Sequence, residues 1–115
     1  EKEMLDRTKK FAPRVLKLVA ALPNTIAGRA VGGQLVRSGT SVASNYRAAC
    51  RGRSKPEFIA KLGIAEEVAD GSCFWMEIII EDGMMPRSKV GSLLNEGHEL
   101  TKIVAASKIK ARQKK

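Results

Sequence analysis

The chain has 115 residues, of which 43% are hydrophobic and 4% aromatic, and its formal net charge is +9. This length predicts a single domain, spanning 1–115, with one mainly aliphatic core. Two cysteines are too few for a disulfide framework, no apolar run approaches the ~18 residues of a membrane span, and the charged start is unlike a signal peptide.

We therefore expect a cytoplasmic protein with no membrane segment, in which Cys50 and Cys73 are buried small hydrophobic residues. The chain starts at Glu1 without an initiator Met, so we expect the native N-terminus to be incomplete here.

The charges are segregated along the chain. Arg7–Pro56 contains eleven Lys or Arg and no carboxylate, Glu57–Glu99 contains nine carboxylates and three bases, and Leu100–Lys115 contains six bases and no acid. Two interpretations stay open. In the first, basic helices pack beside an acidic one and their charges are neutralised. In the second, an exposed basic face binds a polyanion. Charge alone does not identify that polyanion as RNA, DNA or an acidic protein.

The first helix is predicted over about residues 3–21. Apolar residues recur there at helical spacing: Leu5, Phe11, Val15 and Leu18. Pro13 interrupts the pattern, because a proline inside a helix removes one backbone hydrogen bond. The helix should either kink one turn before Pro13 or begin close to Ala12.

The second helix is predicted from the Asn24-Thr25 connector to about Arg51. One face carries apolar residues at the helical period: Val31, Leu35, Val42, Tyr46 and Ala49. Four glycines would weaken this helix in isolation: Gly28, Gly32, Gly33 and Gly39. We interpret them as seams of close helix contact, with simple tolerance of glycine as the alternative.

A basic corner is predicted where the second helix meets the third. Gly52 ends one helix, and Ser54 and Glu57 have the S-x-x-E spacing of a capping box that begins the next. The candidate nucleic-acid-binding residues at this corner are Arg47, Arg51, Arg53 and Lys55. Contacts of this kind would bind phosphates without reading the base sequence.

The third helix, predicted over about 55–82, has two apolar stripes. One contains Phe58, Leu62, Ala65, Ala69, Met76 and Ile79, and the other contains Ile64, Val68, Trp75 and Ile78. A surface helix of a monomer usually shows one stripe, so the second predicts an oligomer interface with Trp75 and Ile78 as its candidate residues. Alternatively, Trp75 completes a broad monomeric core.

Acidic residues on the third helix are assigned a structural role. Arg37 is predicted to form an ion pair with Glu67, one of the three carboxylates Glu66, Glu67 and Asp70. Catalytic carboxylates would face each other across a cleft, and a metal site in a bundle would need Glu-x-x-His motifs, which this chain lacks. We predict no catalytic residue, no metal site and no cofactor, and we place the single histidine, His98, on the surface.

The fourth helix is predicted to open near Pro86, after an Asp82-Gly83 turn. Its apolar stripe contains Val90, Leu93, Gly97, Leu100 and Val104. The basic residues from about 108 to 115 are expected to fray into a mobile tail.

Several motifs carry a family resemblance. The segment RSGTSVASNYRAACR, followed by SKPEFIAKLGIAEE, resembles the bacterial four-helix-bundle proteins once classed as a small ribosomal protein, some of which are encoded in intervening sequences of large-subunit ribosomal RNA genes. Leu22-Pro23, Phe74-Trp75 and the Asp82-Gly83 turn extend the likeness over most of the chain. The resemblance implies an antiparallel bundle that assembles into a ring-like homopentamer, and a distant likeness to accessory proteins of diversity-generating retroelements.

The expected fold is therefore all-α, an antiparallel up-down four-helix bundle. For function, we favour a non-enzymatic, oligomeric accessory module that binds phosphate backbones of RNA or DNA non-specifically. The alternative is a structural module whose partner is another protein and which binds no nucleic acid.

Overall fold

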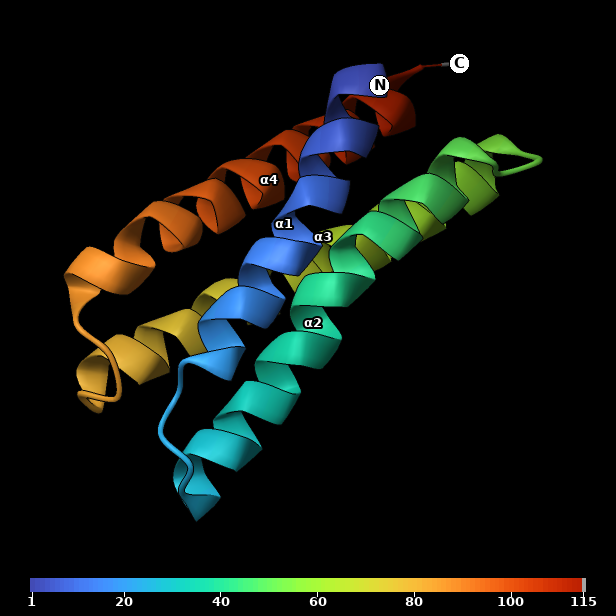
Figure 1. Cartoon of the computed structure of the whole chain (residues 1–115). Helices are drawn as coiled ribbons and strands as arrows, with labels where there is room; N and C mark the ends of the chain where they lie inside the picture. The colour runs from blue at the N-terminus through green and yellow to red at the C-terminus, as the bar shows by residue number, and fades with distance from the viewer. Residues whose placement is uncertain (115) are drawn as a thin grey trace.

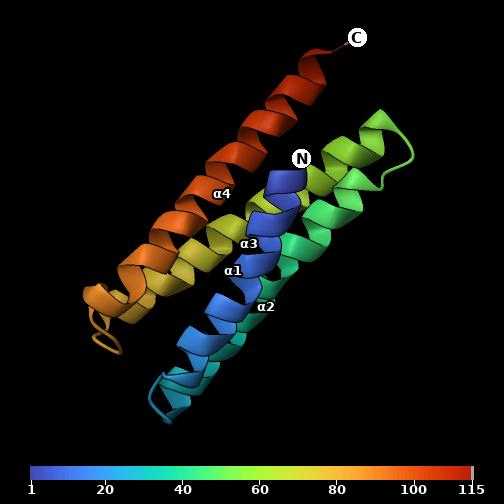
Figure 2. The same ribbon diagram turned by 45° about the horizontal axis from the view of Figure 1, so that its top comes forward.

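The computed structural model describes residues 1–114, which form four long helices joined by short connections. They are α1 (Lys2–Ala20), α2 (Ile26–Cys50), α3 (Lys55–Glu81) and α4 (Arg87–Gln113). Each helix runs back alongside the one before it, so the chain goes up and down (Figures 1 and 2). The bundle measures 50 × 20 × 20 Å. The predicted all-α, four-helix fold is confirmed.

Side chains cap the helices at the two polar connections. The Gly28 N–H donates to Thr25 Oγ1 at 3.0 Å, and the Glu57 N–H donates to Ser54 Oγ at 3.2 Å. Glu57 in turn accepts a hydrogen bond from the Arg53 N–H at 3.2 Å. The Ser54 side-chain cap therefore forms as predicted. The reciprocal hydrogen bond of the capping box differs, because the Glu57 side chain accepts from the N–H of Arg53 and not from the N–H of Ser54.

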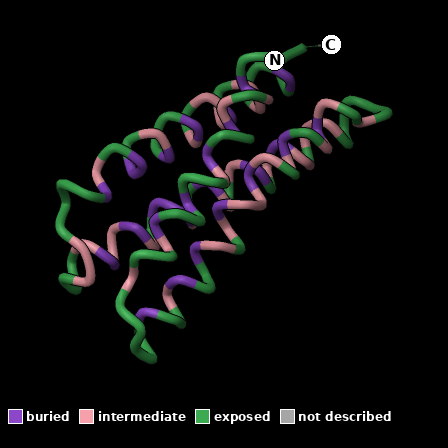
Figure 3. Tube along the Cα trace, in the orientation of Figure 1, coloured by how far each residue is buried: buried purple, intermediate pink, exposed green. Residues whose placement is uncertain are grey.

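The core runs along the inside of all four helices, where buried positions face the bundle axis (Figure 3). Its largest fully buried side chains include Phe11, Leu35, Leu62, Met76 and Leu100. Neighbouring helices in the chain pack extensively, whereas α1 and α4 make fewer contacts. Aliphatic burial at this spacing supplies most of the stability of such a bundle.

Helix α1 continues through Pro13 without a break. Pro13 cannot donate to the carbonyl of Lys9, but both residues are exposed, so water can satisfy that oxygen. The expectation that the helix begins close to Ala12 is therefore wrong.

Two glycines let helices approach closely. A Cβ added at Gly39 would lie 2.7 Å from Val15 Cγ2, and one added at Gly97 would lie 2.8 Å from Cys73 Sγ. A Cβ at Gly33 would meet nothing within 4 Å. The contact-seam interpretation therefore holds at Gly39, where α2 meets α1, and is wrong at Gly33.

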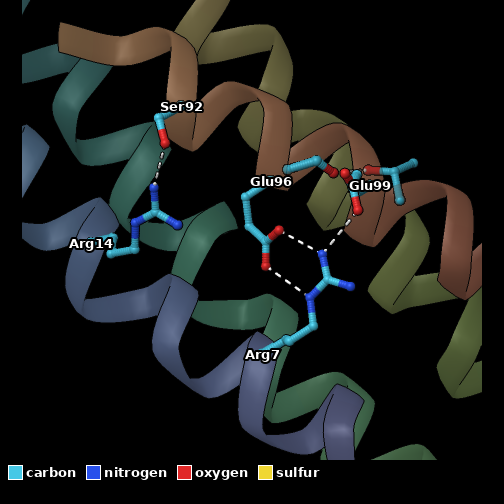
Figure 4. Close-up of polar contacts among 7 residues, drawn as sticks. Arg7, Arg14, Ser92, Glu96 and Glu99 are labelled. Atoms are coloured by element: carbon cyan, nitrogen blue, oxygen red, sulfur yellow. Dashed lines mark hydrogen bonds and ion pairs between the residues drawn. The ribbon is translucent and has the colours of Figure 1, made fainter.

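An arginine–carboxylate cluster joins α1 to α4 (Figure 4). Arg7 Nη2 lies 2.6 Å from Glu96 Oε1, Arg7 Nε lies 3.1 Å from Glu96 Oε2, and Nη2 also contacts Glu99 at 3.2 Å. About two turns further along α1, Arg14 donates to Ser92 Oγ at 3.2 Å. These bonds cross the least extensive of the four helix–helix interfaces.

The predicted ion pair between Arg37 and Glu67 does not form in the structure. Both side chains are exposed, and neither takes part in a salt bridge within residues 1–114. Glu66, one position earlier, turns towards α4 instead and pairs with Lys108 at 2.5 Å. The acidic helix is therefore bridged by a base from the C-terminal block of the chain.

The C-terminal basic segment is helical where the structure describes it. Helix α4 runs to Gln113, Ala111 is buried, and Lys108 is held by Glu66. The expected mobile tail is therefore wrong for residues 108–113. The Lys108–Glu66 pair joins this segment to α3. Lys115, which completes the predicted tail, lies outside the described residues.

Candidate nucleic-acid interface

A basic hollow lies at the corner between α2 and α3. Its volume is about 560 Å³, and its cationic lining residues are Arg47, Arg51, Arg53 and Lys61. Arg47 lies in the last turn of α2, and Arg51, four residues later, is the residue that caps its C-terminus. Arg53 lies in the connection, and Lys61 comes from the second turn of α3. The helix reversal thus brings together bases that lie within fifteen positions of the chain.

Few negative charges balance this hollow. Glu57 is the one carboxylate among its lining residues, and its Oε2 accepts the backbone N–H of Arg53. None of the four bases forms a salt bridge with another described residue, and the three arginines are exposed. Their guanidinium groups are free to form bidentate hydrogen bonds with phosphate oxygens.

A second hollow continues the basic surface onto α1. It has a volume of about 530 Å³, shares Arg47 and Arg51 with the first, and adds Lys9. Glu1 also lines it and offsets part of the charge. We call the combined surface the basic band; it consists of Lys9, Arg47, Arg51, Arg53 and Lys61.

Sequence reasoning found three members of the band and missed two. Arg47, Arg51 and Arg53 were predicted and do come together. Lys61 follows Glu57 by one turn, so helical spacing alone could have found it. Lys9 is distant in sequence, and only the packing of α1 on α2 brings it there.

Lys55, the fourth predicted residue, does not line the basic band. It lines a separate cleft together with Lys110 and Tyr46. Ser54, next to it, lines the same cleft, whereas Arg53 lines the basic hollow. The α2–α3 connection therefore divides its side chains between two concave surfaces.

The predicted interface residues on α3 differ in how far they are covered. Trp75 is half-buried and packs against the core, with its ring edge to face with Phe74 at a centroid distance of 4.9 Å. Ile78 is also half-buried, whereas Phe74 is 49% exposed and Ile64 is 43% exposed. Trp75 thus contributes to the monomer's own core.

Helical geometry places Ile64, Phe74 and Ile78 on the side of α3 opposite the buried Ala69 and Met76. We call these three residues the outer stripe. Because α3 is apolar on both its inner and outer sides, it has the pattern of a helix that is covered from two directions.

Other candidate groups have ordinary surroundings. His98 is exposed, as predicted, and its Nε2 lies 3.7 Å from a Glu77 oxygen. Cys73 is buried and Cys50 half-buried; both are free thiols. Within residues 1–114 there is no cluster of three His, Cys, Asp or Glu residues able to hold a metal ion. Over the same residues, each helix is too short or too polar to cross a membrane.

Comparisons with known proteins agree with the sequence resemblance. A sequence model described as "23S rRNA-intervening sequence protein" matches residues 1–106. A crystal structure of a protein of unknown function from the S23 ribosomal protein family, from Bacteroides thetaiotaomicron, matches with a TM-score of 0.84 and 31% sequence identity. The match covers 90% of this chain and 95% of that one. No curated protein matches the chain.

Proposed function

The chain belongs to the family of 23S rRNA-intervening sequence proteins, and from this premise we propose that it is a non-enzymatic accessory module that binds the phosphate backbone of nucleic acid in the cytoplasm. The observation that carries the proposal is the hollow at the α2–α3 corner, where four bases surround one carboxylate already engaged by a backbone N–H. A concentration of unpaired cations in a concave surface attracts polyanions.

Binding through this surface would be independent of base sequence. The lining residues of both hollows of the basic band include no aromatic side chain on which a base could stack. Arginine and lysine contacts to phosphates position a nucleic acid without reading its bases. Each phosphate neutralised releases counterions, so affinity should fall steeply as salt is raised.

Self-association is the second part of the proposal. The outer stripe presents Ile64, Phe74 and Ile78 on the side of α3 away from the core. A second copy of the chain is the occupant we propose for it, in a homo-oligomer that the family resemblance indicates is a pentamer. Repetition of the basic band in each subunit would raise the affinity for a long polyanion by avidity.

The test compares the protein with a charge-reversal variant. Fluorescence anisotropy with mixed-sequence RNA and DNA oligonucleotides at two salt concentrations should show binding to both, weaker at higher salt. Arg47→Glu with Arg51→Glu should abolish that binding, since it reverses the two residues shared by both hollows. Both side chains are exposed, so the helical fold should be unchanged.

A matched control reverses two exposed bases elsewhere, Arg87→Glu with Lys89→Glu at the start of α4. Equal loss of binding in both variants would show that overall charge, and not the basic band, is responsible. Failure of the unmodified protein to bind at low salt would overturn the nucleic-acid proposal and favour a protein partner.

A further inference from the structure

The start of α1 and the end of α4 lie at the same end of the bundle (Figure 1). Residues from this end line a further cleft. Its volume is about 790 Å³, and its lining residues come from α2, the α2–α3 connection, α3, α4 and the start of the chain. Small-molecule sites in proteins commonly occupy about 300–1,000 Å³. The cleft is therefore large enough for a small ligand. It borders the second basic hollow at Glu1 and Cys50, but none of the five residues of the basic band lines it.

The cleft has a net positive lining. Lys55, Lys110 and Lys114 line it, and Glu1 is the one carboxylate among its lining residues. No salt bridge within the described residues involves any of these three lysines. Lys55 begins α3, Lys110 lies in α4 and Lys114 directly follows α4, so bases from separate parts of the chain line one concave surface and favour an anionic ligand.

A buried phenol supplies a hydrogen-bond donor inside the cleft. Tyr46 is only 6% exposed and lines this cleft alone among the hollows of the structure described above. No hydrogen bond joins its hydroxyl group to a nitrogen or oxygen atom of residues 1–114. Burial raises the pKa of Tyr46 to about 12, and the thiol of Cys50, one turn further along α2, adds to the rise in its pKa. The phenol therefore keeps its proton at neutral pH, and its O–H group can donate a hydrogen bond to an anionic oxygen.

The remaining surface of the cleft includes an apolar part. Ala49, Phe58 and Ala111 line it beside the lysines. Phe58 is half-buried, so part of its ring faces solvent. An aromatic ring next to cationic and phenolic donors matches a ligand that combines a phosphate with a flat aromatic group.

The N-terminus of α3 is not what creates this site. Its Glu57 N–H is bonded to Ser54 Oγ, its Phe58 N–H is bonded to the Ser54 carbonyl, and Pro56 has no N–H. These donors are satisfied within the chain. Recognition would depend on the lysines and on Tyr46.

We propose that this cleft binds a nucleoside monophosphate group, with the phosphate held by Lys55, Lys110 and the Tyr46 hydroxyl and the base against Phe58. Such a group occurs in a free nucleotide and at the 5′-phosphorylated end of a strand. The proposal does not depend on backbone binding by the basic band, because Lys55 and Tyr46 do not line that surface.

Isothermal titration calorimetry with adenosine monophosphate tests the site, with adenosine and inorganic phosphate as partial ligands. Adenosine monophosphate should bind more tightly than either fragment. Lys55→Gln with Lys110→Gln should weaken binding at least about tenfold, since each removes a charged hydrogen bond. The matched control, Lys89→Gln with Lys102→Gln, changes two exposed lysines outside the cleft and should leave binding unchanged.

Tyr46→Phe isolates the phenol, because it removes the hydroxyl group and keeps the ring. It should weaken binding about three- to tenfold, and a thermal melt of each variant confirms that it is folded. Absence of binding at millimolar adenosine monophosphate, equal affinity for adenosine, or equal weakening in the control pair would each overturn the proposal.

Two oligonucleotides that differ only in a 5′-phosphate show whether the bound nucleoside monophosphate group belongs to a strand end or to a free nucleotide. Both are tested against the Arg47→Glu, Arg51→Glu variant, in which the basic band is reversed. Tighter binding of the phosphorylated strand by that variant identifies a strand end. Equal binding of the two strands, with adenosine monophosphate still bound, identifies a free nucleotide.

Discussion

Arg7 of α1 and Glu96 of α4 form a bidentate pair, with one bond of 2.6 Å and one of 3.1 Å, across the helix interface that is otherwise the least extensive of the bundle. The hydrogen bond with Glu96 is the largest cause that raises the pKa of Arg7 above its ordinary value. The guanidinium group is therefore charged at neutral pH, and it couples the first and last helices.

Removal of this pair should loosen the contact between α1 and α4. Both side chains are partly exposed, so Arg7→Ala should cost only about 1 kcal/mol of unfolding free energy. Arg7→Lys should recover only part of the lost unfolding free energy, because lysine cannot form the bidentate hydrogen bonds with Glu96. Arg14→Ala is the control for urea denaturation, since Arg14 is exposed and bonds only Ser92. An equal loss in the control would contradict the assignment.

The glycines of α2 should respond in opposite directions to alanine. Gly39→Ala would force a methyl group to 2.7 Å from Val15 and should destabilise the protein by about 1–3 kcal/mol. Gly33→Ala meets nothing within 4 Å in the same helix and should stabilise it by about 0.4–1 kcal/mol. Thermal melts of the two variants measure both effects. A stabilised Gly39→Ala protein would show that α1 and α2 do not pack as described.

The buried thiol should make stability fall at alkaline pH. Burial raises the pKa of Cys73 to about 11 from an ordinary value near 9. A raised pKa in the folded state means that the contribution is complete below about pH 9 and is lost as pH rises towards 11. Denaturation midpoints should therefore fall across this window, and less so in Cys73→Ala. A pH dependence unchanged by that substitution would assign the effect to another group, such as Tyr46.

Mutation of the outer stripe should dissociate an oligomer. Phe74→Glu places a charge where we propose that a second copy packs, so light scattering should show a smaller mass than for the unmodified protein. Leu16→Glu is a matched control, because Leu16 is 47% exposed on α1 and Phe74 is 49% exposed on α3. A monomeric mass for the unmodified protein at micromolar concentration would refute self-association.

Substitution of two lysines near the α2–α3 corner should show that the basic band and the cleft are separate binding sites. Lys61→Gln should reduce the salt dependence of nucleic-acid binding and leave adenosine monophosphate binding unchanged, because Lys61 lines only the first basic hollow. Lys55→Gln should do the reverse, because Lys55 lines only the cleft. If Lys55→Gln weakens backbone binding as much as Lys61→Gln does, the two surfaces act as one.

The sequence by itself determined the four helices and their order, because each has its own apolar period and its own connector. It also determined the Ser54 cap and most of the corner, since Arg47, Arg51 and Arg53 are local neighbours in the chain. Local spacing is enough wherever a feature is formed within one helix or one turn.

Only the tertiary structure decided which charges meet across helices. Lys9 lines the same hollow as Arg47 and Arg51, Lys108 forms an ion pair with Glu66, and Arg7 forms an ion pair with Glu96. In each case the residues that meet are separated by more than thirty positions in the chain. Arg37 is exposed, although the acidic helix α3 is the next helix in the chain after its own. The physical reason is that burial of the apolar face sets how each helix is rotated about its own axis. Successive residues lie about 100° apart around that axis, so a shift of one position in the sequence directs a charged side chain towards a different neighbouring helix.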